Sequence, residues 1–181
     1  MAGRLGKSYL GRLVGMCLLS PIMAWAGPDA MMSKDQQFLM RASETQKAEI
    51  ALGQMATQRA ESGKVKQLAQ RMVDDHTKAG QEVRKLAEAT GVTLSDETSV
   101  GQQKLGTTDS NLSGEEFDRA YVAHEVKNHQ KNIAEFKKQM KKLKNPQIRQ
   151  WASGTLPVLK EHLIIAKNVL ASLKNEIKKR G

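Results

Sequence analysis

The sequence predicts an all-α fold, a four-helix bundle with a long connection between its second and third helices. Apolar residues recur at alternating three- and four-residue spacings along four long segments, which is the period of an amphipathic helix. Between the second and third segments, residues 91–112 lack this period and are rich in Gly, Ser and Thr. A four-helix bundle accommodates such a segment as a crossover that runs the length of the bundle.

Residues 1–26 have the pattern of a secretory signal peptide. Three basic residues precede an apolar run over residues 13–25, and Ala24-Trp25-Ala26 forms a small-residue frame before Gly27. Ser20-Pro21 interrupts the run, which is shorter than the ~20 apolar residues that a membrane span requires. We therefore expect cleavage after Ala26, no transmembrane span in the mature chain, and a location in the periplasm or at the outer membrane.

Composition limits the chemistry open to the mature chain. Cys17 is the only cysteine, and Met16 before it is too large for the usual lipobox, so we expect a mature chain with no cysteine and no lipid anchor. The remaining 155 residues suit one domain, a linker over 27–32 and a bundle over 33–181. They carry 26 Lys and Arg against 19 Asp and Glu, a net charge of +7.

The first predicted helix covers about residues 34–61. Ser33 followed three residues later by Gln36 has the form of a capping box, and Ser62-Gly63 is a tight break after the helix. Glu49 falls on the apolar stripe of this helix, where a carboxylate is unexpected.

The second predicted helix covers about residues 64–90, and Gly91 is well placed to follow its C-cap. His76 lies on its apolar stripe and is therefore expected to point into the core. Ser113 with Glu116 predicts a second capping box after the long connection.

The third predicted helix covers about residues 114–144, and Glu125 and His129 lie in its apolar sector. Asn145-Pro146 ends this helix and begins the fourth, because proline suits a first helical position. The fourth helix is expected to run to about residue 179.

Three of the four histidines occur in one sequence frame, an apolar residue and two spacers before the histidine, in residues 73–76, 126–129 and 159–162. Glu49 lies 13 residues before the turn at Ser62 and His76 lies 14 after it, while His129 and His162 lie 16 and 17 residues from Asn145. At ~1.5 Å rise per residue, each pair is level across its hairpin. A crossover connection would bring all four side chains near one plane.

A glutamate and three histidines in one plane predict a site for one divalent transition metal ion, since imidazole suits Zn, Cu, Fe and Ni while carboxylate admits Mn. The candidate supporting residues are Asp75, Glu125 and Glu161. A di-iron carboxylate centre requires Glu-x-x-His on two helices. Here the residues three before each histidine are Val73, Val126 and Leu159, so the pattern favours a mononuclear site.

The alternative interpretation is structural. Core histidines often donate a hydrogen bond to a neighbouring carboxylate, and such a network can fix the register of the helices without any metal. No Gly-x-Ser-x-Gly frame and no Gly-rich phosphate loop occurs in the sequence, so nucleophilic catalysis has no support.

Several motifs together resemble a known family. They are, in order, Glu49, the segment Met72-Val73-Asp74-Asp75-His76, Phe117-Asp118-x-x-Tyr121, His129, and Leu156-Pro157-x-Leu159-Lys160-Glu161-His162. This order, over residues 35–173, is similar to the ferritin-like exported bacterial family called domain of unknown function 4142. The resemblance implies a four-helix bundle and an envelope location, and it implies no activity.

Two functional hypotheses follow. The first is a non-enzymatic exported protein that acts in envelope interaction or stress tolerance, with anionic lipid, lipopolysaccharide or cell wall, and not nucleic acid, as its partner. The candidate contacts are the basic ends of the last two helices. They are Lys137, Lys138, Lys141, Lys142 and Lys144, and Lys174, Lys178, Lys179 and Arg180. The alternative interpretation is that these lysines and this arginine are ordinary solvated charges at helix C-termini. The alternative is a mononuclear metal-binding or redox bundle.

Overall fold

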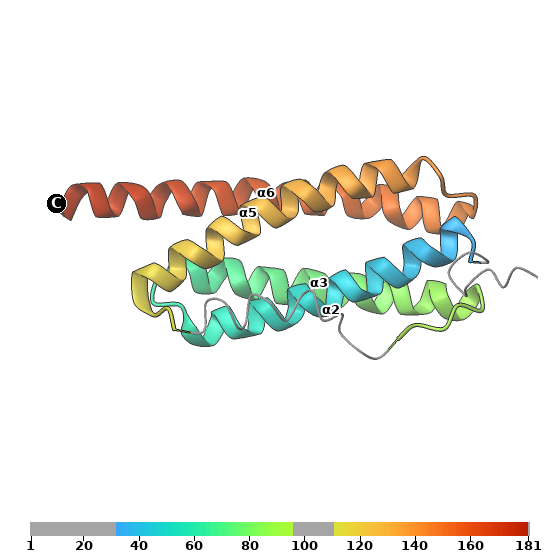
Figure 1. Cartoon of the computed structure of the whole chain (residues 1–181), viewed down its shortest axis with the longest axis horizontal. Helices are drawn as coiled ribbons and strands as arrows, with labels where there is room; N and C mark the ends of the chain where they lie inside the picture. Colours follow the sequence, from blue (N-terminus) through green and yellow to red (C-terminus); the bar gives the residue numbers. More distant parts are fainter. Residues whose placement is uncertain (1–31, 96–110, 181) are drawn as a thin grey trace, which may run out of the picture. The chain divides into compact units, whose positions relative to one another are not determined.

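The computed structural model describes residues 32–95 and 111–180, which form four α-helices and, within these two ranges, no strand (Figure 1). The helices are α2 (Lys34–Arg59), α3 (Gly63–Ala89), α5 (Gly114–Met140) and α6 (Pro146–Arg180). The predicted all-α four-helix bundle is confirmed. The expected signal peptide, most of the expected linker and most of the long connection lie outside the described residues.

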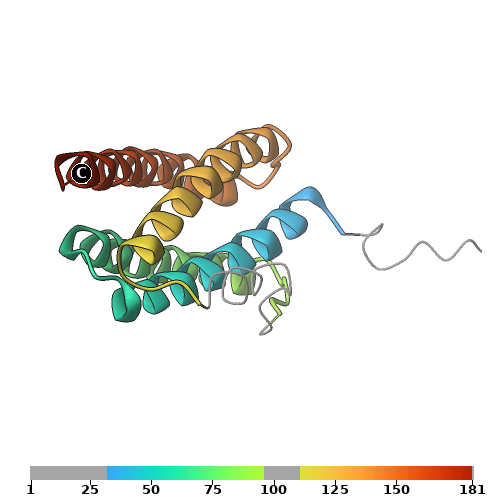
Figure 2. The same ribbon diagram turned by 60° about the vertical axis from the view of Figure 1, so that its left-hand side comes forward.

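The helices pair as two antiparallel hairpins, α2 with α3 and α5 with α6. A turned view shows the hairpins as two layers (Figure 2). Because α5 begins beside the turn between α2 and α3, the end of α3 and the start of α5 lie at opposite ends of the bundle. This arrangement agrees with the predicted crossover and makes α3 and α5 run in the same direction.

Each interhelical turn is held by an aspartate from the other hairpin. Asp118 of α5 accepts hydrogen bonds from the backbone N–H groups of residues 61–62, at 3.1 and 2.7 Å. Asp35 of α2 accepts from the backbone N–H groups of residues 144–145, at 2.9 and 3.1 Å. Hydrogen bonds to a charged acceptor are stronger than neutral ones. These two contacts therefore fix how far one hairpin can slide along the other.

The apolar core consists of two clusters, one toward each end of the bundle. The cluster at the α2–α3 turn includes Leu68, Met72 and Phe117, and the cluster at the other end includes Phe38 and Ile148. In the chain, the segments that form the two clusters are separated by a stretch of buried polar residues on every helix. The bundle is therefore apolar at both ends and polar in the middle.

The helix ends follow the sequence signals in part. The Ser33–Gln36 capping box and the left-handed Gly91 (φ 66°) are both formed. The second capping box, predicted at Ser113 and Glu116, is wrong, because the Ser113 side chain makes no cap hydrogen bond. Gly114 follows it with a φ of 57°. A residue in the left-handed region directly after the cap turns the helix N–H groups away from the Ser113 side chain.

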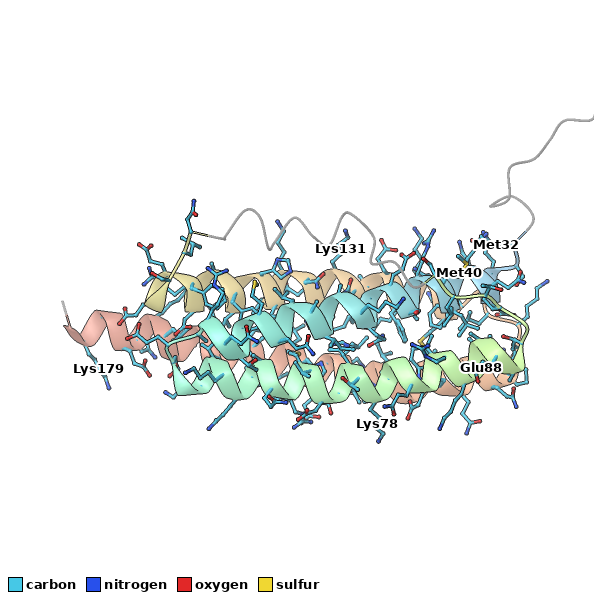
Figure 3. All side chains as sticks on the ribbon, turned by 90° about the horizontal axis from the view of Figure 1, so that it is seen from below. Met32, Met40, Lys78, Glu88, Lys131 and Lys179 are labelled. Carbon is cyan, nitrogen blue, oxygen red and sulfur yellow. The ribbon has the colours of Figure 1, made fainter. Side chains whose placement is uncertain are left out.

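The exterior of the bundle is densely charged, and Lys78, Lys131 and Lys179 point away from it (Figure 3). The two lysine-rich helix ends lie at opposite ends of the bundle, because α5 and α6 are antiparallel. Among the described residues, no helix has a stretch apolar and long enough to span a bilayer.

Replacement of glycine by alanine should have different effects on stability at two positions in the first hairpin. A β-carbon at Gly53 would lie 2.8 Å from Val73 Cγ2 and 3.0 Å from the backbone oxygen of Ala69, whereas at Gly80 the nearest atom, Gln46 Cβ, is at 3.4 Å. We expect Gly53→Ala to lower the free energy of unfolding by ~1–3 kcal/mol through overpacking. The control Gly80→Ala should leave it unchanged or raise it by up to ~1 kcal/mol, because alanine is the better helix former. Urea unfolding followed by circular dichroism measures both, and equal effects would contradict the close approach of α2 to α3.

Candidate metal centre

A layer of buried polar side chains lies in the middle of the bundle. All four helices contribute to it, and every member is at most 4% exposed. The members are Gln46 and Glu49 from α2, His76 from α3, Glu125 and His129 from α5, and His162 from α6. Burying polar groups without partners is costly. The contacts within the layer therefore decide what it can do.

The three histidines of the layer come from three different helices and meet. Their ring centroids are 5.9 Å apart for His76 and His129, 5.2 Å for His76 and His162, and 5.3 Å for His129 and His162. One ring nitrogen of each lies within 4.8 Å of the others. The recurring sequence frame thus places one imidazole from each of α3, α5 and α6 in a single cluster.

Each imidazole has one ring nitrogen on a hydrogen-bond acceptor. His76 Nδ1 lies 2.6 Å from Gln46 Oε1, and His162 Nε2 lies 2.9 Å from Asp75 Oδ2. His129 Nδ1 lies 3.1 Å from the backbone oxygen of Glu125 and 3.2 Å from its Oε2. A ring nitrogen that faces an acceptor carries the proton, which leaves the other nitrogen with a free lone pair. The three free nitrogens are then His76 Nε2, His129 Nε2 and His162 Nδ1.

Two of the free nitrogens face each other, and the third is buried. His129 Nε2 and His162 Nδ1 are 3.3 Å apart, and His76 Nε2 is buried without a hydrogen-bond partner among the described residues. Two lone pairs at this distance repel unless a proton or a cation lies between them. Two imidazole nitrogens on one tetrahedral zinc ion, each ~2.0–2.1 Å from the metal, are themselves ~3.3 Å apart. The spacing of His129 and His162 matches that of two ligands of one ion.

Asp75 connects the histidine cluster to the surface. Its Oδ2 also accepts from Arg71 Nε at 2.6 Å, and another Arg71 nitrogen lies 3.2 Å from Glu161 Oε1. Partial burial opposes ionisation of Asp75, but the hydrogen bonds from His162 and Arg71 outweigh it and lower its pKa. The predicted supporting residue Glu161 is half exposed and contacts Arg71 rather than a histidine. It can act on the cluster only through Arg71 and Asp75.

Burial keeps two of the imidazoles neutral. Loss of water, followed by the proximity of His162 and His129, lowers the pKa of His76 to about 3. Burial also lowers the pKa of His162, although the hydrogen bond to Asp75 opposes this effect. Neutral imidazole is the form that binds metal.

Glu49 and Glu125 form a carboxylate pair on the other side of His129. One ligand atom from each of Glu49, Glu125 and His129 lies within 4.8 Å of the others. Asn128 donates to Glu49 Oε1, while Glu49 Oε2 and both oxygens of Glu125 are buried and, among the described residues, contact only the opposite carboxyl and, for Glu125 Oε2, His129 Nδ1. Burial, and for Glu49 also the charge of Glu125, raises the pKa of each carboxyl to about 8. Glu49 therefore groups with Glu125 and His129 rather than with all three histidines.

Sequence reasoning missed one residue of this layer, Gln46, and two residues beside it, Asn128 and Tyr121. Gln46 precedes Glu49 by one helical turn, so its place on the same stripe was a usable signal. In the sequence pattern Asn128 is only the second spacer before His129. The hydroxyl of Tyr121 is buried with no hydrogen-bond partner among the described residues, and burial followed by the nearby Glu125 and Glu49 raises its pKa.

The fold and the layer define an all-α four-helix bundle with a buried histidine and carboxylate centre. The chain belongs to the family described as Domain of unknown function (DUF4142), which matches residues 21–169. No curated protein and no solved structure matches the chain. The family assigns no activity, so a function has to come from the residues of the centre.

The carboxylate pair predicts how stability depends on pH in the absence of metal. Both carboxyls have a folded-state pKa of about 8 against an ordinary value of 4.5, so the stability they confer is complete below about pH 4.5 and is lost as the pH rises through 8. His76 and His162 have lowered pKa values, so the stability they confer is lost only below 6.5. Between about pH 6.5 and 8 the melting temperature should therefore fall as the pH rises.

Thermal melting in chelator across this range measures the effect. The double variant Glu49→Gln with Glu125→Gln keeps the side-chain shapes and removes both titrations, so its melting temperature should be nearly flat from pH 6.5 to 8. An equal slope in the wild type and the double variant would show that the two carboxyls are already ionised in the folded protein.

Proposed function

We propose that this protein binds a divalent transition metal ion through His76 Nε2, His129 Nε2 and His162 Nδ1. One observation carries the proposal. Three buried imidazoles from three helices have ring nitrogens within 4.8 Å of one another, and an acceptor lies on one nitrogen of each ring and leaves the other available. Metal-binding histidines almost always have such a second partner, which fixes the tautomer and the orientation of the ring.

The donor set favours particular ions. Three imidazole nitrogens suit zinc and copper better than calcium or magnesium, which prefer oxygen. Zinc sites with three protein ligands leave a fourth position for water or a substrate. The proposed activity is therefore metal binding, with an open position on the ion, and it assigns no reaction.

The surroundings of the three nitrogens support a cation. Burial favours the neutral forms of His76 and His162, and the ionised Asp75 next to His162 supplies a negative charge close to them. A pocket lined mainly by α2 and α5 side chains includes Gln46, whose side chain holds His76. The pocket therefore reaches a residue that contacts the histidine cluster, and an entry path is a requirement of a metal site.

The rival proposal is that the layer is a hydrogen-bond network that only holds the helices in register. Under that proposal His129 Nε2 carries a proton and donates it to His162 Nδ1. The two proposals differ in one measurable property, because only a metal site makes the folded protein more stable when the right ion is added.

Thermal melting with single ions tests the proposal. In chelator-treated protein, Zn²⁺ or Cu²⁺ should raise the free energy of unfolding by ~2.7 kcal/mol at a hundredfold excess over the dissociation constant. His76→Ala should lose the part of this gain that comes from the three histidines. The control is His124→Ala, which removes the one histidine that lies outside the layer and should keep the whole gain. A wild-type melting temperature indifferent to Zn, Cu, Mn and Fe ions would overturn the metal site and leave the network.

We further propose that the chain is exported and processed after Ala26, on the strength of the apolar run and the small-residue frame before Gly27. An anionic component of the envelope is the partner that the two lysine-rich helix ends would favour. Their position at opposite ends of the bundle means that they would contact such a component separately.

The intact mass of protein recovered from the periplasm tests export. The mass should correspond to a chain that begins at Gly27. A chain that retains Met1, or one that begins at a lipid-modified Cys17, would contradict the proposed processing.

A further inference from the structure

We propose a second cation site on the opposite edge of the His129 ring, formed by Glu49, Glu125 and His129 Nδ1. Its ligand is a divalent first-row ion that accepts oxygen donors, with Mn²⁺ or Fe²⁺ favoured over softer ions. This site rests on the proposed function only through the ring of His129, which the two sites share. The protein would then hold two ions of different donor chemistry rather than one.

The carboxylate oxygens are arranged as ligands. The Glu49 side chain is 2% exposed and that of Glu125 is completely buried. Asn128 donates to one oxygen of Glu49 and so orients the carboxylate. Among the described residues, the other oxygen of Glu49 and both oxygens of Glu125 contact only the opposite carboxyl group and, for Glu125 Oε2, His129 Nδ1 at 3.2 Å. Three buried carboxylate oxygens with so few donors around them are rare in folded proteins. A divalent cation would satisfy all three.

The charges of Glu49 and Glu125 also favour a bound cation. Without metal, burial raises the pKa of both carboxyls and so favours their protonated forms. Once ionised, two carboxylates within 4.8 Å of each other repel strongly in an apolar core unless a cation lies between them. No lysine or arginine is among the buried residues of the described chain. A divalent ion would cancel the two negative charges, which no side chain at this position does.

The ring of His129 can serve both sites because its two nitrogens face different groups. Nε2 lies 3.3 Å from His162 Nδ1, and Nδ1 lies 3.2 Å from Glu125 Oε2. An ion held by Glu49, Glu125 and His129 Nδ1 would replace the proton on Nδ1 and any protons on the two carboxyls, and these protons would pass to the buffer. With both sites filled, each nitrogen of the His129 ring would face one ion.

Binding stoichiometry tests the second site. Tag-free, chelator-stripped protein is dialysed against Zn²⁺, and bound metal is measured by elemental analysis. The wild type should bind two ions per chain. Glu49→Gln with Glu125→Gln should bind one ion, at the histidines, and His76→Ala should bind one, at the carboxylates. A control variant, Glu88→Gln with Glu135→Gln, removes the same number of charges from exposed positions and should still bind two.

A parallel dialysis against Mn²⁺ separates the sites by chemistry. Mn²⁺ should bind to the wild type and to His76→Ala, and at least tenfold more weakly to the double glutamine variant. Circular dichroism and thermal melting of each variant show that it is folded before its metal content is compared.

The outcomes distinguish the two proposals. One zinc ion in both the wild type and the double glutamine variant, with none in His76→Ala, would overturn the second site and leave the histidine site. One zinc ion in the wild type and in His76→Ala, with none in the double glutamine variant, would overturn the histidine site instead. A wild type without bound metal would overturn both.

Discussion

The cost of removing polar groups from water governs the middle of this bundle. Three imidazoles, two carboxyls and an amide lie where a four-helix bundle ordinarily packs apolar side chains. Each would destabilise the fold if it stood alone. The layer is tolerated because its members contact one another, and because burial keeps His76 neutral and favours the protonated carboxyls. The same property makes the layer receptive to cations, since a neutral imidazole has a lone pair to donate.

Such a layer requires the helices to stay in register. A shift of one residue along a helix axis is ~1.5 Å, which is enough to break contacts of about 3 Å between ring nitrogens. Asp118 and Asp35 each hold the turn of the opposite hairpin, at the two ends of the bundle. Gly53 lets α2 approach α3 closely next to the layer. The ends of the fold therefore set the geometry of its centre.

The centre is divided by the ring of His129. On one side are neutral nitrogen donors supported by Gln46 and Asp75, and on the other are buried carboxylate oxygens with few donors around them. This division does not correspond to a single mononuclear site of one glutamate and three histidines. Two adjacent sites, one rich in nitrogen and one rich in oxygen, would use every buried polar atom of His129, Glu49 and Glu125. The chemistry of the protein would then depend on which ions fill them.

The sequence by itself determined the helices, their order and the residues that face the core. The three- and four-residue spacing predicted four helices whose bounds agree with the structure to within a few residues, and it placed Glu49, His76, Glu125 and His129 on buried faces, while the distance from the turn placed His162 level with His129. Only the tertiary structure decided which of these side chains meet. The helical period fixes the height of a residue and the sector into which it points, but not the rotation of one helix against the next or the rotamer. For this reason the spacing alone could not predict that Glu49 groups with Glu125, that Glu161 contacts Arg71, or that Gln46 holds His76.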